Sequence, residues 1–140
     1  MADNNAEKIN ASFQAQTMMQ TLGARLTGVS KGCVEIQAPI LPGSQQQHGF
    51  AHAGLTFAIG DSAAGYAALS VMPPDHEVLT SEMKIHLLSP GRGAVLIARG
   101  RVIKPGRRLV VVQADVYART NDEEVHIAML TGTMVPVVPQ

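Results

Sequence analysis

The sequence predicts an α+β fold in which a curved antiparallel sheet wraps around one long central helix. Two patterns carry this prediction. Residues 53–72 form a long, alanine-rich run that is nearly free of charged side chains, which is typical of a helix buried on all sides. The segments that follow alternate apolar and polar residues and are separated by short turns, as in neighbouring antiparallel strands.

The elements before the long helix are shorter. Residues 6–21 contain neither glycine nor proline and predict an N-terminal helix that stops at Gly23. Residues 24–30 and 33–38 predict two short strands joined by a tight turn. Residues 39–51 hold two prolines and two glycines, so we expect a loop that leads into the long helix.

Four strands are expected after the helix, which ends at a pair of prolines. We place them at residues 78–88, 94–104, 108–119 and 125–135. Strict alternation in the first of them puts Leu79 and Met83 on one face of the sheet and Thr80 on the other. In the last strand, the apolar residues Val125, Ile127 and Met129 alternate with their neighbours in the same way.

Composition limits the classes of function. The 140 residues suit a single domain spanning 1–140, and 11 basic residues balance 11 acidic ones. This balance argues against a nucleic-acid binder or a polybasic membrane-surface protein. Charged residues make up only 16% of the chain, against roughly 25% in typical globular proteins. We therefore expect part of the surface to be covered in a homo-oligomer.

The ends and the single cysteine add three expectations. The N-terminal segment is polar and shows no signal-peptide pattern, and no run is apolar enough to span a membrane, so a cytoplasmic protein is expected. The lone Cys33 excludes an internal disulfide and a multi-cysteine zinc site, and core packing is its expected role.

Asp61 is the only charged residue in the long predicted helix. A buried carboxylate without a partner is costly, so its pKa should rise or it must gain hydrogen bonds. A carboxyl group in that state suits general-base or nucleophilic catalysis. The structural alternative is a carboxylate that caps a nearby loop or pairs with an arginine across a subunit interface.

The segment of residues 48–54 lies where the loop meets the start of the helix. Unpaired backbone N–H groups at a helix N-terminus can bind a developing oxyanion, and the small residues Ala53 and Gly54 allow a carbonyl group to come close. For His52 the alternative role is a structural hydrogen bond. His48 and His52 are spaced for metal binding only on a helix, and the loop composition argues against a metal site.

Asp61 follows His52 by nine positions, which is roughly 13 Å along a helix. One chain's helix start and its own Asp61 therefore cannot both touch one reacting carbon. If both serve one site, that site needs two chains.

Basic residues gather at two predicted turns. Arg92, Arg107 and Arg108 could hold the phosphates of a ligand, or they could form a solvated positive rim. The chain has no glycine-rich dinucleotide motif and no Walker motif, and we expect no metal and no bound cofactor.

The run Gly49-x-x-His52-Ala53-Gly54-Leu55, followed by Asp61, resembles the signature of hotdog-fold acyl-CoA thioesterases of the phenylacetate-pathway (PaaI-like) type. Residues 83–90, which end in Ser-Pro, and residues 106–116 are also similar, and the resemblance covers roughly residues 25–135. It implies a hotdog fold, dimers that often pair into tetramers with active sites at the dimer interface, and hydrolysis of acyl-CoA to a free acid and CoA.

The resemblance also implies site roles. Asp61 would be the general base or nucleophile, Thr80 would help place the attacking water, and the Ala53 N–H would polarise the thioester carbonyl, with His52 orienting the loop. Gln46 would contact the carbonyl region, with Gln47 as a neighbouring possibility. Six residues are expected to bind the substrate. They are three residues that directly follow Gln46, Ala53 and Asp61, and the three arginines of the predicted turns: Gln47, Gly54, Ser62, Arg92, Arg107 and Arg108.

Two positions depart from the family pattern. Position 53 is alanine where the signature has glycine, so a positive φ there would be strained. Position 46 is glutamine rather than asparagine. Two other functions stay open: an enoyl-thioester hydratase on the same fold, although no histidine follows Asp61 by a few positions, and a non-catalytic acyl-CoA-binding or sensing module.

Overall fold

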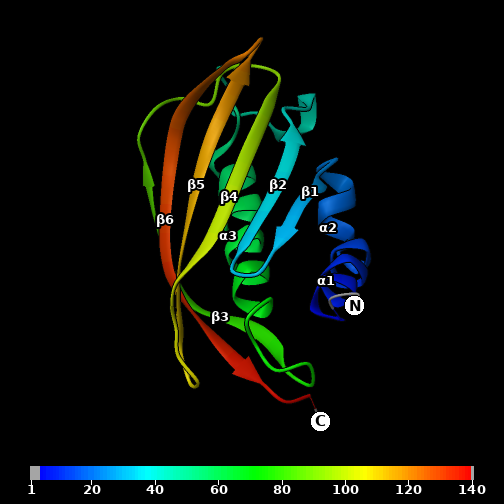
Figure 1. Cartoon of the computed structure of the whole chain (residues 1–140). Helices are drawn as coiled ribbons and strands as arrows, with labels where there is room; N and C mark the ends of the chain where they lie inside the picture. Colours follow the sequence, from blue (N-terminus) through cyan, green and yellow to red (C-terminus); the bar gives the residue numbers. More distant parts are fainter. Residues whose placement is uncertain (1–3, 140) are drawn as a thin grey trace.

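The computed structural model describes residues 4–139. Six antiparallel strands form one curved sheet, in the order β1-β2-β4-β5-β6-β3, and helix α3 (Ala53–Leu69) lies along its inner side (Figure 1). The fold is the hotdog fold, as predicted. The strands are β1 (Arg25–Ser30), β2 (Cys33–Pro39), β3 (Glu77–Leu87), β4 (Val95–Pro105), β5 (Val110–Thr120) and β6 (Glu123–Val137).

The N-terminal segment forms two helices where one was predicted. Helix α1 (Asn4–Ala15) ends at Ala15, and the extended backbone of Gln16 separates it from the short helix α2 (Thr17–Thr21). Both lie beside β1, and α1 also contacts α3 (Figure 1). The side-chain amide of Gln16 donates a hydrogen bond of 2.6 Å to the hydroxyl of Tyr66 in α3. This tertiary contact accompanies the break, and the local composition gives no sign of it.

Helix α3 packs closely on the sheet because glycine and alanine face each other. A Cβ at Gly100 in β4 would lie 2.4 Å from the backbone carbonyl of Ala63, so only glycine fits there. The core around this contact consists of small and aliphatic side chains from α3 and the strands.

Contrary to the prediction, α3 is not buried on all sides. One strip along the helix stays at least partly exposed in the single chain, and Phe57 within it is 37% exposed. The strip runs from the first turn to the middle of the helix and consists of Ala53, Gly54, Phe57, Ala58, Asp61 and Ser62.

The predicted face assignment of β3 was wrong for Leu79 and Thr80. The pairing of β3 with β6 shifts register between Thr80 and Glu82, which leaves Ser81 as a β-bulge. A bulge adds one residue and reverses the alternation beyond it. Thr80 and Met83 therefore both face the inner side of the sheet, whereas Leu79 points outward and is 60% exposed.

A similar irregularity breaks the alternation predicted for the last strand. The register between β5 and β6 shifts at Ile127, so that both Ile127 and Ala128 are buried. The inner face of β6 then continues through Leu130 and Met134, while Val125 is exposed and Met129 is only half-buried.

Two other findings concern Cys33 and the membrane-spanning potential of the helices. Cys33, expected in the core, is exposed, because it opens β2 directly after the hairpin turn. Within residues 4–139, none of the helices combines the length and the apolar character that a membrane crossing requires.

Candidate active site

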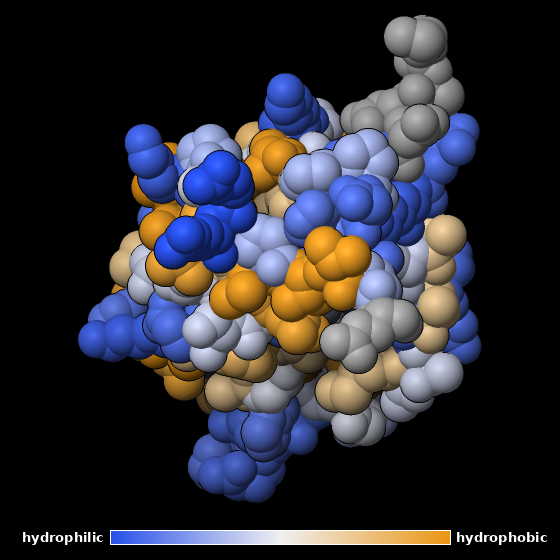
Figure 2. Space-filling model, turned by 90° about the horizontal axis from the view of Figure 1, so that it is seen from below, coloured by the Kyte–Doolittle hydropathy of each residue, from blue (hydrophilic) through white to orange (hydrophobic). Residues whose placement is uncertain are grey.

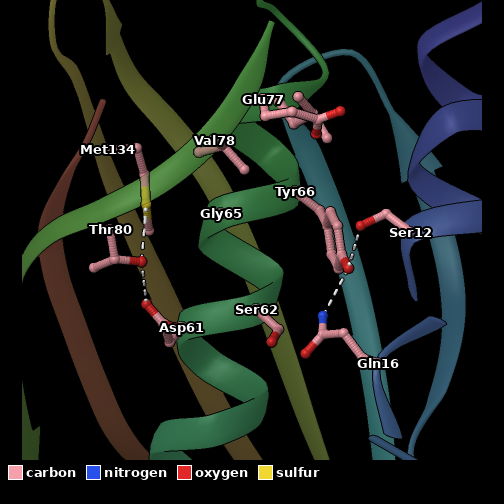
Figure 3. A pocket seen from close by; sticks show the side chains of 11 residues that line it. Ser12, Gln16, Asp61, Ser62, Gly65, Tyr66, Glu77, Val78, Thr80 and Met134 are labelled. Atoms are coloured by element: carbon pink, nitrogen blue, oxygen red, sulfur yellow. Dashed lines mark hydrogen bonds between the residues drawn. The ribbon is translucent and has the colours of Figure 1, made fainter. Parts of the chain in front are cut away.

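Asp61 lies in the middle of α3 and meets Thr80 of β3. The Thr80 hydroxyl donates a hydrogen bond of 2.8 Å to Oδ1 of Asp61, and the Sδ atom of Met134 lies 3.3 Å from the same hydroxyl (Figure 3). The bulge at Ser81 turns Thr80 inward and makes this contact possible. Within residues 4–139, Oδ2 of Asp61 accepts no hydrogen bond, so it is available to a water molecule or a substrate.

The surroundings of Asp61 change its acidity. Partial burial raises the pKa of Asp61 above its ordinary value, and the hydrogen bond from Thr80 offsets part of that rise. No arginine or lysine among the described residues forms an ion pair with it, so the structural alternative of an arginine partner is not realised within this chain. A carboxyl group with a raised pKa is a stronger base once it has ionised.

A cavity of about 250 Å³ opens beside Asp61. Its walls come from α3, β3, β6 and the junction of α1 and α2, and they include Ser62, predicted as a substrate contact (Figure 3). Sequence reasoning did not place Ser12, Gln16 or Met134 at this cavity, because only the packing of three separate segments brings them together.

Tyr66 closes the inner wall of the cavity. Its hydroxyl lies 3.0 Å from Oγ of Ser12 and accepts a hydrogen bond of 2.6 Å from Gln16 (Figure 3). The ring is buried and meets Phe13 edge-on, with 6.3 Å between the ring centroids. These contacts fix the orientation of Tyr66.

His52 caps the N-terminus of α3. Its Nδ1 accepts a hydrogen bond of 2.8 Å from the backbone N–H of Gly54, so the structural role considered for this histidine is present. The backbone N–H of Ala53, by contrast, reaches no acceptor within residues 4–139. Ala53 has no positive φ, so alanine causes no backbone strain at this position. The helix therefore offers one free amide, that of Ala53, at its start.

Gln46 belongs to the loop that precedes this free amide. Its Oε1 accepts hydrogen bonds from the backbone N–H groups of His48 and Phe50, at 2.5 and 3.2 Å, which fixes the loop and leaves the Nε2 group as a donor. Gln46 and Ala53 line one hollow of about 490 Å³, formed by the loop, α3 and the end of β3. Gln47 is exposed and makes no polar side-chain contact with the described residues.

The three arginines predicted to bind phosphate are not together in one chain. The Arg92 guanidinium lies 4.6 Å from the centroid of the Phe50 ring, near the start of α3. Arg107 lines a different hollow beyond the far end of α3, with Val71 and Pro136, and Arg108 follows it in the exposed β4–β5 turn. Figure 2 shows this end of the molecule, where hydrophobic side chains gather near the middle and hydrophilic ones surround them.

The Asp61 cavity and the hollow at the helix start are thus separate. Ala53 and Asp61 are eight positions apart in one regular helix, which is about 12 Å. None of the described residues lines both spaces. Within residues 4–139, no group of three or more His, Cys, Asp or Glu residues is arranged to hold a metal ion.

Comparison with known proteins shows the family of this chain. Residues 48–125 match the family model of the thioesterase superfamily. The chain belongs to this superfamily. A solved thioesterase family protein from Silicibacter pomeroyi is similar over 96% of this chain and 99% of its own, with 42% identity and a TM-score of 0.94.

More distant relatives share the fold. The E. coli PaaI protein, from the phenylacetic acid degradation operon, has a TM-score of 0.86 at 18% identity, over 96% of this chain and 94% of its own. A 1,4-dihydroxy-2-naphthoyl-CoA hydrolase of Listeria monocytogenes is 22% identical over 74% of this chain and 84% of its own length. Membership of the thioesterase superfamily supports hydrolysis of an acyl thioester as the activity of this chain.

Proposed function

We propose that this thioesterase hydrolyses acyl-CoA to a free acid and CoA, with Asp61 as its general base or nucleophile. The observation that carries the proposal is the Asp61–Thr80 pair at the mouth of the cavity: a partly buried carboxyl group with a raised pKa and one free oxygen. CoA as the thiol is supported by the Listeria relative, whose name specifies a CoA thioester.

In the general-base route, Asp61 takes a proton from water while the water oxygen attacks the thioester carbonyl carbon. The backbone N–H of Ala53 stabilises the resulting oxyanion, and the Nε2 group of Gln46 contacts the same region. Collapse of the intermediate breaks the C–S bond, and the CoA thiolate takes the proton back from Asp61. In the nucleophilic route, the Asp61 carboxylate itself attacks the carbonyl carbon and CoA leaves as a thiolate. Water then hydrolyses the mixed anhydride to the free acid and the Asp61 carboxylate, and the CoA thiolate takes the proton that this step releases.

Both routes need a second copy of the chain, because one chain holds Ala53 and Asp61 about 12 Å apart. The exposed strip on α3 suggests how the copies meet. Phe57 lies midway between Ala53 and Asp61, so two antiparallel α3 helices that cross at Phe57 bring Ala53 of one chain opposite the partner subunit's Asp61. Burial of the strip in this dimer would also remove the apolar Phe57 from water.

The edge of the sheet supports the same dimer. Strand β3 is the last strand at one edge and is 11 residues long, and Leu79 and Leu87 on it are each 60% exposed. A long edge strand with exposed leucines readily pairs with another chain. In such a dimer, Arg92 would come from the chain that supplies Ala53, and Arg107 and Arg108 from the chain that supplies Asp61, as candidates for the CoA phosphates.

The test is release of free thiol from a panel of acyl-CoA thioesters. We expect release by the wild type, a loss of about a hundredfold or more in kcat for Asp61→Asn, and retained acyl-CoA binding by that variant. Asp122→Asn, in the exposed β5–β6 turn, is the matched control and should keep full activity.

Two results would contradict the proposal. Tight acyl-CoA binding without thiol release by the wild type would indicate a binding module instead. A loss below about tenfold in Asp61→Asn would show that Asp61 is not catalytic. Single turnover in oxygen-18 water separates the two routes, because label in the Asp61 carboxylate supports direct attack by Asp61.

A further inference from the structure

The cavity beside Asp61 has a size that constrains its ligand. Its volume is about 250 Å³, whereas an apolar cavity of about 150 Å³ in another protein holds benzene. The space therefore admits an aromatic ring or an acyl chain of similar bulk. Hydrogen bonds with Ser12 and Gln16 and the edge-on contact with Phe13 hold the Tyr66 ring in place on the wall of the cavity.

Gly65 forms part of the cavity wall one helical turn after Asp61. A Cβ at this position would lie 3.8 Å from Cε of Met134, which is an ordinary contact, so packing does not require glycine. Gly60 in the same helix differs, because a Cβ there would lie 2.9 Å from both Cδ atoms of Leu130.

Glycine inside a helix is less favourable than alanine by about 1 kcal/mol. Gly65 therefore lowers the stability of α3 without relieving any clash. What glycine supplies at this position is free space beside the catalytic carboxyl group.

The charges around the cavity are acidic. Asp61 and Glu77 both line it, and the described lining residues include no lysine, arginine or histidine. Glu77 has a partner in Lys8, whose Nζ lies 3.4 Å from its carboxylate, so this lysine is already paired. An acyl group that ends in a carboxylate would meet two acidic groups and no free cation among these residues.

We propose that this cavity receives an uncharged acyl group of up to about the bulk of an aromatic ring, and that Gly65 sets the largest group accepted. The inference rests on the proposed acyl-CoA hydrolysis and specifies its substrate class.

The experiment compares kcat/KM for benzoyl-CoA and acetyl-CoA in the wild type and in Gly65→Ala. A single added methyl group in such a pocket should lower the benzoyl-to-acetyl ratio about tenfold or more, while the melting temperature stays equal or rises. Gly43→Ala is the control, because no atom outside Gly43 and its two chain neighbours lies within 4 Å of the added Cβ, and the ratio should not change. Val78→Leu, which adds bulk from the β3 wall, gives the same expectation if Gly65→Ala does not fold.

A second arm tests charge with two acyl groups of equal length and branching, those of glutaryl-CoA and the uncharged 5-methylhexanoyl-CoA. We expect the wild type to prefer the uncharged thioester, and Glu77→Gln to reduce that preference. Hydrolysis with an unchanged benzoyl-to-acetyl ratio in the folded Gly65→Ala and Val78→Leu variants overturns the role of Gly65. Equal rates on the charged and uncharged pair overturn the charge selection. A wild type that releases thiol from none of these thioesters overturns the proposed function as well.

Discussion

Thr80 donates a hydrogen bond of 2.8 Å to Asp61 and thereby joins the edge strand β3 to the central helix α3. The contact exists because the bulge at Ser81 turns Thr80 to the inner side of the sheet. It stabilises the ionised form of Asp61, while burial of the same carboxyl group favours the neutral form. The acidity of Asp61 is the balance of these two effects.

Replacing Thr80 by valine should shift the pH profile of hydrolysis. Asp61 must be ionised to act, so kcat/KM falls as the pH drops through its pKa. Burial already places this pKa above the ordinary value, and removal of the Thr80 hydrogen bond raises it further. We expect the acidic limb of the kcat/KM profile of Thr80→Val to lie at higher pH than that of the wild type.

Thr80→Ser is the matched variant for this measurement, since it keeps the hydroxyl group, and its acidic limb should stay near the wild-type position. If Thr80→Val and the wild type share one acidic limb, the hydrogen bond does not tune the catalytic group.

Asp61→Asn should stabilise the fold at neutral pH. The pKa of Asp61 is higher in the folded than in the unfolded state, so ionisation costs stability as the pH rises from about 4, the unfolded pKa, through the folded pKa. The uncharged amide of the variant avoids this cost. Melting temperatures measured from pH 3.5 to pH 8, a range set around those pKa values, should coincide at the acidic end and favour Asp61→Asn at the other. A wild type that melts higher than the variant at pH 8 would show that ionised Asp61 is not penalised.

The cap at His52 should contribute to stability. His52→Ala removes the acceptor for the Gly54 N–H and should cost about 0.5–2 kcal/mol in the free energy of unfolding. Asparagine is a good N-cap residue, so His52→Asn should recover most of that loss. Denaturant unfolding of the three proteins measures both effects, and equal midpoints for His52→Ala and the wild type would rule out a stabilising cap.

Gly100 should tolerate no side chain, because a Cβ there would lie 2.4 Å from the backbone of Ala63. The backbone cannot rotate away as a side chain can, so we expect Gly100→Ala to lose about 1–3 kcal/mol of stability or more. The comparison is Gly28→Ala in β1, where the Cβ would make an ordinary 3.5 Å contact with Glu35. Similar unfolding midpoints for the two variants would mean that α3 can move away from the sheet at little cost.

The sequence predicted the elements whose signals are local. The run around Asp61 has the composition of a buried helix. The strands after it alternate apolar and polar residues and are bounded by clear turns, so the predicted ranges of these strands agree with the structure to within a few residues. The lone acid in that helix also identifies Asp61 as a candidate catalytic residue from the sequence alone.

The features that sequence analysis missed depend on contacts between distant segments. Strict alternation put Thr80 on the outer face, and only the pairing of β3 with β6 shows the bulge that turns it inward. The break at Gln16 coincides with a hydrogen bond to Tyr66, 50 residues away. The exposed strip around Phe57 could not be predicted, because the composition of the helix suggests complete burial.

The shared site can be tested by mixing two variants that are each expected to be inactive, because the proposed site needs both the Asp61 carboxyl group and the start of α3 that His52 caps. Asp61→Asn lacks the carboxyl group and His52→Ala disturbs the helix start, so a mixed dimer has one intact site and one doubly altered site. Equal mixing after subunit exchange gives about half mixed dimers and therefore about a quarter of wild-type acyl-CoA hydrolysis. A mixture of Asp61→Asn with Asp61→Ala should stay inactive. If exchange is verified and the first mixture also stays inactive, Asp61 and the helix start do not come from different chains.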